Sequence, residues 1–328
     1  MKKQVGILGI GSYVPEKVVT NYDLMKTMDT SHEWIIERTG ISTRHIAAEG
    51  EYTSDLAVKA AERALADAGV KAEELDLIIV GTATPDMPFP ATACLVQEKL
   101  GARKVAAFDL TAACAGFMYG VVIGSKFIET GFYKKVLVIG AETLSRIVDW
   151  EDRNTAILFA DGAGAVVLGE SEESGILGTC LGADGSCGDL LKVPGGGSCA
   201  PTSLETVQNR MHYIKMDGNS IFKIAVKTMG EAAKVALDNA GLTYDDISYM
   251  IPHQANIRII QAMAKRLNMP MDRVIVNLDK YGNTSAATIP IALDEAVKSG
   301  VIKKGDIVLT VTFGGGLTWG AGIIKWLK

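Results

Sequence analysis

The sequence predicts an α/β protein made of two similar halves, and three observations support this prediction. Short apolar segments rich in Ile and Val alternate with longer amphipathic segments along most of the chain. This alternation is typical of mostly parallel sheets covered by helices. The 328 residues, 48% of them hydrophobic, suffice for a large core in one big domain or two ordinary ones. The third observation is an internal repeat.

In the first half, apolar periodicity and helix-stop signals predict each element in turn. Residues 5–11 should form a strand. Thr30 and Glu33 have the spacing of a capping box at a helix start. The other elements expected here are, in chain order, a helix at 53–68, a strand at 76–82, a helix at 91–100, a strand at 104–110, a helix at 117–123, a strand at 135–140 and a glycine-rich apolar segment at 156–169.

The second half repeats this order. Cys114 corresponds to about Thr284 under the repeat, and the halves should span residues 1–170 and 171–328. A near-constant offset over several elements indicates that two similar units were joined in tandem. Three matched pairs define the offset: Gly69 and Gly241 (241 − 69 = 172), Asp109 and Asp279 (279 − 109 = 170), and Lys134 and Lys303 (303 − 134 = 169).

Composition excludes several classes of protein. The net charge of −5 makes broad nucleic-acid binding unlikely, so an anionic partner would need a local basic patch. Five cysteines without a CxxC motif argue against a disulfide framework or a zinc site and favour a reducing cytosol. Residues 1–11 resemble a polar start and a strand rather than a signal peptide, and no apolar run is long enough to span a bilayer.

Cys114 is the first candidate catalytic residue. It lies between the strand expected at 104–110 and the helix expected at 117–123, among residues with small side chains. A helix N-terminus favours negative charge, which would lower the pKa of the thiol, and the thiolate is the reactive form. A buried core cysteine is the alternative interpretation.

His253 and Asn283 are grouped with Cys114 by the repeat. His253 follows the apolar strand at 247–251, and Asn283 lies close to the position that corresponds to Cys114. Equivalent strand ends in two similar halves tend to meet at one crevice. The alternatives are a structural histidine and an ordinary turn asparagine.

Two further segments are glycine-rich or irregular. Residues 313–320 follow the last apolar strand and could line a substrate with backbone N–H groups or simply form a flexible turn. Residues 182–220 contain three consecutive glycines and are expected to form a long excursion over the surface, of a kind that often covers a site.

Four motifs taken together resemble β-ketoacyl-acyl carrier protein synthase III, the condensing enzyme that starts bacterial type II fatty acid synthesis. They are TAACAGF at 111–117, IPHQAN at 251–256, YGNTS at 281–285 and FGGG at 313–316. The resemblance extends over essentially the whole chain and implies a thiolase-like fold, with two pseudo-symmetric βα halves packed into a layered αβαβα core. It also implies a homodimer.

The resemblance implies a catalytic triad of Cys114, His253 and Asn283. Cys114 would take an acyl group from acyl-CoA, and His253 and Asn283 would stabilise the enolate formed when malonyl-acyl carrier protein loses CO₂. The backbone N–H groups of Cys114 and Gly315 would form the oxyanion hole. No metal or redox cofactor is implied, because acyl-CoA is a substrate. No cysteine follows Cys199, which disfavours reversible thiolase chemistry.

The resemblance also implies binding residues. For CoA they are Trp34, Arg38, Thr39, Arg153, Asn256 and Arg258, with Trp34 and Arg153 placed to sandwich the adenine and Arg38 to meet phosphate. Asn154 stands where relatives often have glycine, so the nucleotide end could differ. For the acyl pocket they are Phe89, contributed across the dimer in relatives, and Phe313. For the acidic carrier protein they are Lys223, Arg258, Lys265 and Arg266, which could equally be ordinary solvated charges.

Rival interpretations remain at this point. A polyketide or alkylquinolone condensing enzyme would share part of the motif set. A non-catalytic acyl-binding protein would be expected to lack Cys114, His253 or Asn283, and a Cys–His thiol hydrolase would not need Asn283. The acyl primer cannot be deduced, because primers differ by a few methyl groups in the pocket, each worth about 1 kcal/mol.

Overall fold

Two sheets form the frame of the protein in the computed structural model, which describes residues 3–328. The first sheet has the strand order β1-β7-β6-β4-β5. Its central strands β4 and β6 are parallel, whereas β7 runs antiparallel to both of its neighbours. Its strands are β1 (Val5–Tyr13), β4 (Leu77–Gly81), β5 (Ala106–Leu110), β6 (Lys135–Thr143) and β7 (Asp161–Glu170).

The second sheet has the order β11-β12-β13-β8. Its strands β11 and β12 are parallel, and β13 is antiparallel to β12 and β8. Its strands are β8 (Ile176–Ala183), β11 (Tyr249–Pro252), β12 (Ile307–Gly314) and β13 (Thr318–Lys325).

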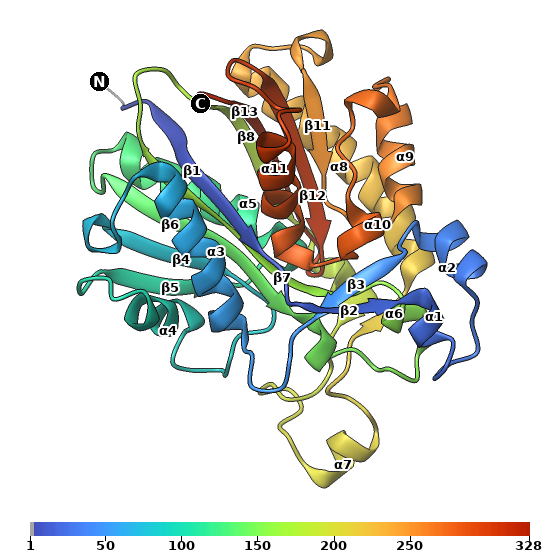
Figure 1. Ribbon diagram of the computed structural model, residues 1–328. Coiled ribbons are helices and arrows are strands. Elements are labelled where there is room, and N and C mark those ends of the chain that lie inside the picture. The colour runs from blue at the N-terminus through green and yellow to red at the C-terminus, as the bar shows by residue number, and fades with distance from the viewer. Residues whose placement is uncertain (1–2) are drawn as a thin grey trace.

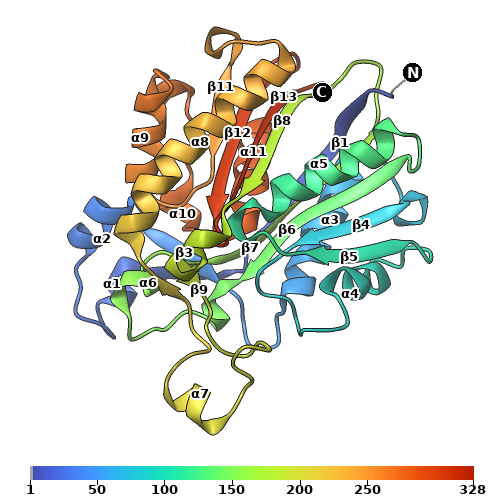
Figure 2. The same cartoon turned by 180° about the vertical axis from the view of Figure 1, so that it is seen from behind.

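Helices cover both sheets and fill the space between them (Figure 1, Figure 2). The central pair, α5 (Gly116–Glu129) and α11 (Thr288–Lys298), shares one hydrophobic core with strands of both sheets. On the outer faces, α3 (Thr53–Ala68) and α4 (Thr92–Lys99) pack on the first sheet. The helices α8 (Gly218–Ala240) and α9 (Ile257–Arg266) pack on the second. The predicted layered αβαβα arrangement is therefore confirmed.

The repeat is more regular in the structure than in the sequence. The offset is 172 for β4 and β11 (249 − 77), for α5 and α11 (288 − 116) and for β6 and β12 (307 − 135). Each central helix is preceded by one 3₁₀ turn, η2 (Ala113–Ala115) or η7 (Ser285–Ala287). The turns begin at Ala113 and Ser285, which have φ values of 44° and 49°. Cys114 therefore corresponds to Ala286, which corrects the estimate of about Thr284.

The N-terminal segment departs from a simple two-half plan. Its elements are β2 (Lys17–Thr20), α1 (Asn21–Leu24), α2 (His32–Thr39) and β3 (Thr43–Ile46). The helix α2 packs against α9, and β3 packs against α10 (Leu278–Tyr281), so this segment lies beside the second half. The strands of the first sheet lie within 5–170 and those of the second within 176–325. The division of the chain at residue 170 remains a prediction.

Local hydrogen bonds correct one predicted helix start. The residue that caps α2 is Ser31, whose hydroxyl accepts from the backbone N–H of Trp34 at 3.1 Å. The Thr30 hydroxyl is buried without a hydrogen-bond partner. The helix predicted at 53–68 stops at Gly69, and α8 stops at the matching Gly241, because both glycines adopt the left-handed conformation that ends a helix.

The excursion between the halves contains only short elements, namely η4 (Gly185–Leu190), β9 (Leu191–Lys192), α7 (Leu204–Gln208) and β10 (Lys215–Met216), before α8 begins. Its α7 protrudes from the body of the protein (Figure 1). Leu191 instead turns inward and lines the cavities described below.

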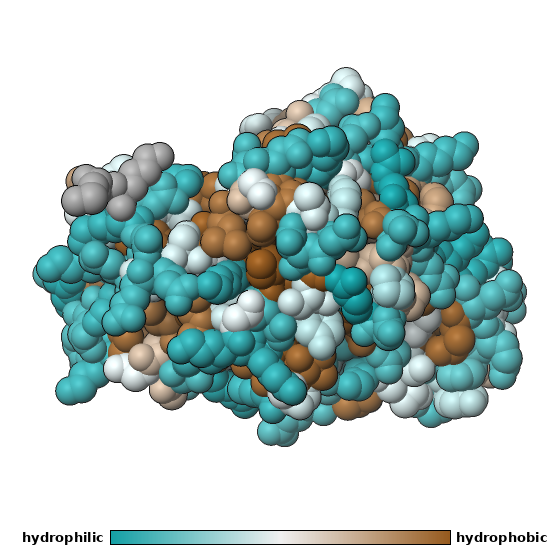
Figure 3. Space-filling model, turned by 90° about the horizontal axis from the view of Figure 1, so that it is seen from above, coloured by the Kyte–Doolittle hydropathy of each residue, from teal (hydrophilic) through white to brown (hydrophobic). Residues whose placement is uncertain are grey.

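The surface is mainly hydrophilic when seen from the end where the chain termini lie, with apolar residues gathered near the middle (Figure 3).

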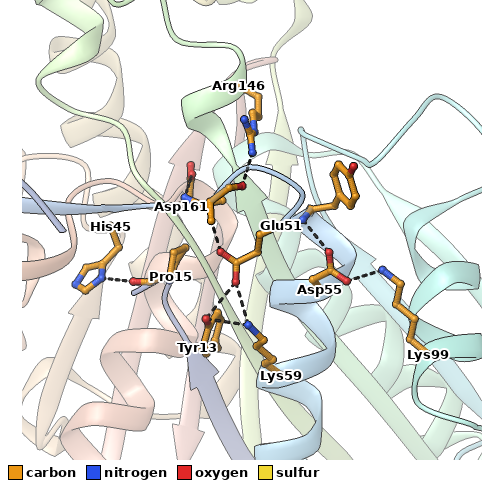
Figure 4. Close-up of polar contacts among 12 residues, drawn as sticks. Tyr13, Pro15, His45, Glu51, Asp55, Lys59, Lys99, Arg146 and Asp161 are labelled. Carbon is orange, nitrogen blue, oxygen red and sulfur yellow. Dashed lines mark hydrogen bonds and ion pairs between the residues drawn. The ribbon is translucent and has the colours of Figure 1, made fainter. Parts of the chain in front are cut away.

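Polar contacts also tie the first strand to its covering helix. Glu51 accepts hydrogen bonds from Tyr13 of β1 and Lys59 of α3 (Figure 4). Within residues 3–328, no helix has the length and hydropathy needed to cross a membrane.

Candidate active site

Cys114 lies in η2, directly after the end of β5 and before α5. The space around it admits only small residues. A Cβ atom on Gly314 would lie 2.6 Å from the Cys114 backbone nitrogen, and one on Gly81 would lie 2.6 Å from the carbonyl carbon of Gly116. Glycine is therefore required where β4 and β12 approach the turn that carries the thiol.

His253 and Asn283 reach the same cavity from the second half. His253 follows β11, and its backbone N–H donates to Val311 on β12 at 2.7 Å. Asn283 follows α10, and its backbone N–H donates to Leu158 at 2.9 Å. Cys114, His253 and Asn283 together line a small cavity of about 80 Å³. The structure thus brings together the three side chains that the sequence grouped.

The Asn283 side chain has a defined orientation. Its Oδ1 accepts a hydrogen bond from the Ser285 backbone N–H at 2.9 Å. Because the amide oxygen is used in this way, the Nδ2 group is the part of the side chain left to donate a hydrogen bond in the cavity. This suits a residue that stabilises negative charge on a substrate oxygen.

His253 is held from behind by Thr288. Its Nδ1 lies 2.7 Å from the Thr288 hydroxyl, which also lies 3.0 Å from the carbonyl oxygen of Ser285. Burial lowers the pKa of His253 to about 3, so the imidazole is neutral at neutral pH. With Nδ1 engaged by Thr288, Nε2 is the ring nitrogen that remains for a substrate.

Burial has the opposite consequence for the thiol. It raises the pKa of Cys114 to about 12, so the thiol keeps its proton in the protein without substrate. The expectation that the helix start lowers this pKa is therefore wrong for the free protein. The reason is that desolvation of the thiolate outweighs the hydrogen bond that stabilises it, and Cys114 lies two residues before α5 begins.

The glycine-rich loop after β12 is tied to the cysteine turn. The Thr318 hydroxyl donates to the carbonyl of Ala112 at 2.7 Å, and the Thr312 hydroxyl donates to the carbonyl of Cys114 at 2.8 Å. Gly315 and Cys114 both line a second, more open cavity of about 630 Å³. The expected oxyanion hole stays a prediction, and these bonds are what would hold its two backbone donors in place.

Comparisons with known proteins identify the family. Two models of 3-oxoacyl-[acyl-carrier-protein] synthase III match this chain, at residues 108–185 and, for the C-terminal part, 237–326. The β-ketoacyl-[acyl-carrier-protein] synthase III of Caldanaerobacter subterraneus subsp. tengcongensis is 58% identical over 328 residues, which cover 100% of this chain and 99% of the relative. This chain belongs to the 3-oxoacyl-[acyl-carrier-protein] synthase III family.

Solved structures agree with this assignment. The 3-oxoacyl-[acyl-carrier-protein] synthase III of Aquifex aeolicus is 51% identical, with a TM-score of 0.91 over 98% of this chain and 100% of that one. The priming β-ketosynthase of the R1128 polyketide pathway is 36% identical, with a TM-score of 0.93 over 100% and 97% of the two chains. The fold is therefore thiolase-like, and the chain is an acyltransferase-type condensing enzyme of fatty acid synthesis.

Three of the six CoA residues expected from the synthase III family, Trp34, Arg38 and Arg153, lie together. The guanidinium carbons of Arg38 and Arg153 lie 4.7 Å and 5.0 Å from the centre of the Trp34 ring. Arg153 also donates to the carbonyl of Asp29 at 2.9 Å. An adenine could therefore enter between Trp34 and Arg153 only if Arg153 moved away from the ring.

The other CoA residues occupy different surroundings. Asn256 caps α9 and lines the small cavity with Cys114, whereas Arg258 is exposed on the first turn of α9. Thr39 is buried, and its hydroxyl donates to Ile35 at 2.7 Å and accepts from the backbone N–H of Ile41 at 3.0 Å. Its part in CoA binding stays a prediction, because these two bonds already use the hydroxyl.

Phe89 and Phe313 lie in opposite environments. Phe313 is buried on β12 and lines the small cavity. The Phe89 side chain is 84% exposed, beside Pro88, which lines the larger cavity. Phe89 cannot close an acyl pocket within one copy of the chain, so its expected role depends on a second copy.

The expected carrier-protein residues are all exposed on neighbouring helices. Lys223 lies on α8, and Arg258, Lys265 and Arg266 lie on α9. None of the four forms a salt bridge with any residue in the range 3–328. The helix α9 contains no acidic residue, so it presents unneutralised positive charge on an otherwise acidic chain.

Three residues around the triad were not predicted as site residues from the sequence. Thr288 contacts His253, Ser285 lines the larger cavity together with Cys114, and Glu142 is buried near the end of β6. Glu142 did carry a signal, because a charged residue that follows the apolar run Val136–Ala141 within one strand is unusual. Ser285 and Thr288 gave none, since small polar residues are common before helices.

Proposed function

We propose that this chain joins a short acyl-CoA primer to malonyl-acyl carrier protein by decarboxylative Claisen condensation. The products would be 3-ketoacyl-acyl carrier protein, CoA and CO₂, which is the initiating step of type II fatty acid synthesis. The observation that carries the proposal is the cavity that Cys114, His253 and Asn283 line together. The names of the relatives support it, because they describe β-ketoacyl-[acyl-carrier-protein] synthases III.

The first half-reaction is acyl transfer to Cys114. The sulfur attacks the thioester carbonyl, the carbon–sulfur bond to CoA breaks, and CoA leaves. The backbone N–H groups of Cys114 and Gly315 would stabilise the oxyanion. Removing one such donor typically costs about 3–4 kcal/mol of transition-state stabilisation. No metal or redox cofactor is needed, because the thioester supplies the leaving group.

The second half-reaction uses the other two residues. Nδ2 of Asn283 and Nε2 of His253 would donate to the malonyl thioester oxygen as CO₂ departs. For His253 this requires the tautomer with a proton on Nε2, in which the Thr288 hydroxyl turns its single proton from the Ser285 carbonyl oxygen to Nδ1. The resulting carbanion would attack the acyl-Cys114 carbonyl and release the cysteine. A neutral imidazole suits this role, because its Nε2–H can donate a hydrogen bond to the thioester oxygen while the ring carries no positive charge.

Both substrates, acyl-CoA and malonyl-acyl carrier protein, would enter from the side of α2, α8 and α9. Trp34, Arg38, Arg153, Asn256 and Arg258 are proposed to hold CoA. The exposed basic residues of α8 and α9 are proposed to bind the acidic carrier protein, since complementary charge speeds encounter. Binding should therefore weaken as ionic strength rises.

We further propose a cytosolic homodimer. The edge strand β5 pairs only with β4 among the described residues, and it exposes Phe108. The larger cavity beside Cys114 is open, and the exposed Phe89 follows Pro88, which lines that cavity. A second copy across β5 would cover both features. All five cysteines are free, as is common in a reducing compartment.

The decisive experiment is intact-protein mass spectrometry after mixing with a panel of short acyl-CoAs, followed by a chase with malonyl-acyl carrier protein. An adduct on Cys114 that the chase discharges as ketoacyl carrier protein would support the proposal and identify the primer. An adduct that water alone removes would indicate a hydrolase. The absence of any adduct would reject the acyl-CoA part of the proposal.

A further inference from the structure

Arg44 is a buried cation without a carboxylate partner. It lies on β3 and is 0% exposed. None of the ion pairs within residues 3–328 includes it, and its Nε is buried without a hydrogen-bond partner. Burial lowers the pKa of Arg44 to about 10, so the guanidinium is still charged at neutral pH. Burying an unpaired charge is costly, and an arginine in such a place therefore needs an explanation.

The guanidinium joins two distant parts of the chain. Its Nη1 donates to the carbonyl of Val19 at 3.2 Å. Its Nη2 donates to Oδ1 of Asn21 at 2.9 Å and to the carbonyl of Ile157 at 3.1 Å. Val19 and Asn21 belong to β2 and α1, whereas Ile157 directly follows α6 (Arg153–Ala156). Arg44 thus connects the N-terminal segment to the end of α6.

The geometry of these contacts suits arginine in particular. Arginine presents its donors in a rigid planar fork, and both Nη2 protons are used, one on Asn21 and one on Ile157. The Asn21 oxygen faces the fork because Asn21 Nδ2 donates to the carbonyl of Ile41 at 2.8 Å. All three acceptors of the guanidinium are uncharged. The contacts therefore fix the position of the Ile157 carbonyl without neutralising the buried charge.

The residues that follow Ile157 hold the main chain of Asn283. The backbone N–H of Asn283 donates to the carbonyl of Leu158 at 2.9 Å, and the backbone N–H of Ala160 donates to the carbonyl of Asn283 at 3.0 Å. Between these two bonds, Phe159 and Asn283 form a parallel β-bridge. The backbone of Asn283 is therefore fixed on both sides by residues 157–160.

The stem of Arg44 lies close to the residue before Asn283. Gly282 has a φ of 66°, and a Cβ there would lie 3.4 Å from the Cβ of Arg44 and 3.2 Å from the carbonyl oxygen of Leu158. The strand β3 also packs against α10, which leads directly to Gly282 (Figure 1, Figure 2). Arg44 therefore supports Asn283 from two directions, with its guanidinium at Ile157 and its stem near Gly282.

We infer that Arg44 is a positioning residue for Asn283. It holds residues 157–160 in place, and these residues hold the main chain from which Asn283 reaches the cavity that it lines with Cys114 and His253. Arg44 lines neither that cavity nor the larger one, so it acts through Asn283 and not on a substrate. The inference rests on the proposed function, since it takes Asn283 as a hydrogen-bond donor in the second half-reaction.

The alternative is that Arg44 only fastens the N-terminal segment, which carries Trp34 and Arg38. Loss of that role would lower stability and raise the KM for acyl-CoA. It would not single out the half-reaction that uses Asn283. The two roles therefore differ in what they predict for the maximal rates of the two half-reactions.

The test is to measure both half-reactions in Arg44→Met, which keeps a long side chain but has no donor. At saturating malonyl-acyl carrier protein, CO₂ release should slow at least tenfold, since a misplacement of about 1 Å can cost 100-fold. At saturating acetyl-CoA, acylation of Cys114 should change less than threefold in a rapid-quench assay read by intact-protein mass spectrometry. The reason is that, within residues 3–328, no hydrogen bond joins Arg44 or residues 157–160 to the cysteine turn.

Two further variants test the route and the geometry. If Arg44 acts through Asn283, then Arg44→Met should slow CO₂ release less than threefold in a chain that already carries Asn283→Ala, because coupled residues are not additive. Arg44→Lys keeps the buried charge, but a single ammonium does not match the fork. It should therefore slow CO₂ release at least tenfold and leave acylation within threefold.

Leu65→Ala is the control for lost stability. Leu65 is buried on α3, in a core that contains none of residues 157–160 and no residue of the second half. The truncation should lower the urea midpoint of unfolding, because it leaves a cavity. Both half-reactions should stay within threefold of the wild type under conditions in which the variant is folded.

The outcomes separate the two proposals. A wild type that no acyl-CoA acylates, or that releases no CO₂ from malonyl-acyl carrier protein, would overturn the proposed function and this inference with it. A wild type that does both, with an Arg44→Met variant that slows the two half-reactions equally or slows neither, would overturn the positioning role alone. Slowing by Arg44→Met that is as large in the Asn283→Ala chain as in the wild type would also overturn it.

Two alternatives keep the test decisive. If Arg44→Met does not fold, Arg44→Lys is judged by the same criteria. If Asn283→Ala releases no measurable CO₂, the difference between the two half-reactions in the single variants decides.

Discussion

At the scale of single residues, burial controls the chemistry of this site. It disfavours the charged form of every titratable group around the cavity, so the thiol and the imidazole are both neutral at pH 7. The function proposed here then depends on where protons lie and not on permanent charges. This makes the hydrogen-bond partners behind the triad as important as the triad itself.

His253 should make the folded protein sensitive to acid. Its pKa falls from 6.5 to about 3 on folding, so the unfolded chain binds the proton first, and stability present above pH 6.5 is lost as pH falls towards 3. Between pH 7.5 and 5 the loss due to this one group is about 2 kcal/mol. Urea unfolding of the wild type and His253→Gln at both pH values checks this. The prediction is wrong if both proteins lose the same free energy.

Thr288 should matter for the second half-reaction more than for the first. Thr288→Val removes the partner of Nδ1 and frees the imidazole to change tautomer and rotate. We expect CO₂ release from malonyl-acyl carrier protein to slow about 10- to 100-fold, within the range that acid–base groups contribute. Acylation of Cys114 should change less than threefold. Thr288→Ser keeps the hydroxyl and should restore decarboxylation, and a serine variant as slow as the valine one would contradict this role.

The sequence showed only part of this site. Cys114 and His253 could be grouped because each follows a predicted strand, and Asn283 because it lies close to the position that corresponds to Cys114 in the repeat. Ser285 and Thr288 could not, because their importance comes from which groups pack around the triad. That depends on how η7 packs between β6 and η2, which no local pattern records. The raised pKa of Cys114 was missed for the same reason, since burial is a property of the folded structure.

At the scale of elements, close backbone contacts set the position of the thiol. The strand β4 meets the start of α5 where Gly81 faces Gly116, and β6 meets η7 where Gly140 faces Ala286. A Cβ on Gly140 would lie 2.4 Å from the Ala286 carbonyl oxygen. The predicted elements are correct in kind, and their ends are less accurate. The helix expected at 117–123 in fact spans Gly116–Glu129, because its last turns are more polar than its first.

Gly81→Ala should therefore damage both stability and catalysis. Its Cβ would lie 2.6–2.9 Å from three backbone atoms of Gly116 and Phe117, which cannot rotate away. We expect a loss of about 1–3 kcal/mol in unfolding free energy. Cys114 acylation should slow at least tenfold, since a misplacement of about 1 Å can cost 100-fold. Gly185→Ala is the control, because nothing lies within 4 Å of its Cβ position. Equal behaviour of the two variants would refute this account.

At the scale of the whole molecule, duplication explains how the site is built. Two units with a 172-residue offset place their central helices α5 and α11 side by side between the sheets. The turns before these helices then meet, and one carries Cys114 while the other carries Ser285. The sequence repeat predicted this convergence. It could not predict that residues 17–46 pack beside the second half, because that contact lies outside the duplicated elements.

The proposed dimer gives the last prediction. Among residues 3–328, the edge strand β5 pairs only with β4, and Phe108 is 36% exposed on it. An unprotected apolar edge invites pairing with another chain, and a lysine at such an edge blocks it. Phe108→Lys should therefore be a monomer by light scattering at a concentration where the wild type is a dimer. It should also lose condensing activity, since Phe89 of a second copy would no longer close the larger cavity.

Val301→Lys is the matched control. Val301 is 41% exposed and follows α11, away from the β5 edge, so the same change in charge and hydropathy there should leave the dimer intact. The activity of the Phe108→Lys variant then shows whether condensation needs the dimer. If Phe108→Lys is monomeric and inactive, adding an excess of a Cys114→Ala chain with a native edge should not rescue it, because the lysine edge still blocks pairing. A monomer with full activity would show that one copy of the chain completes the acyl pocket by itself, and the assignment of Phe89 to the partner would be wrong.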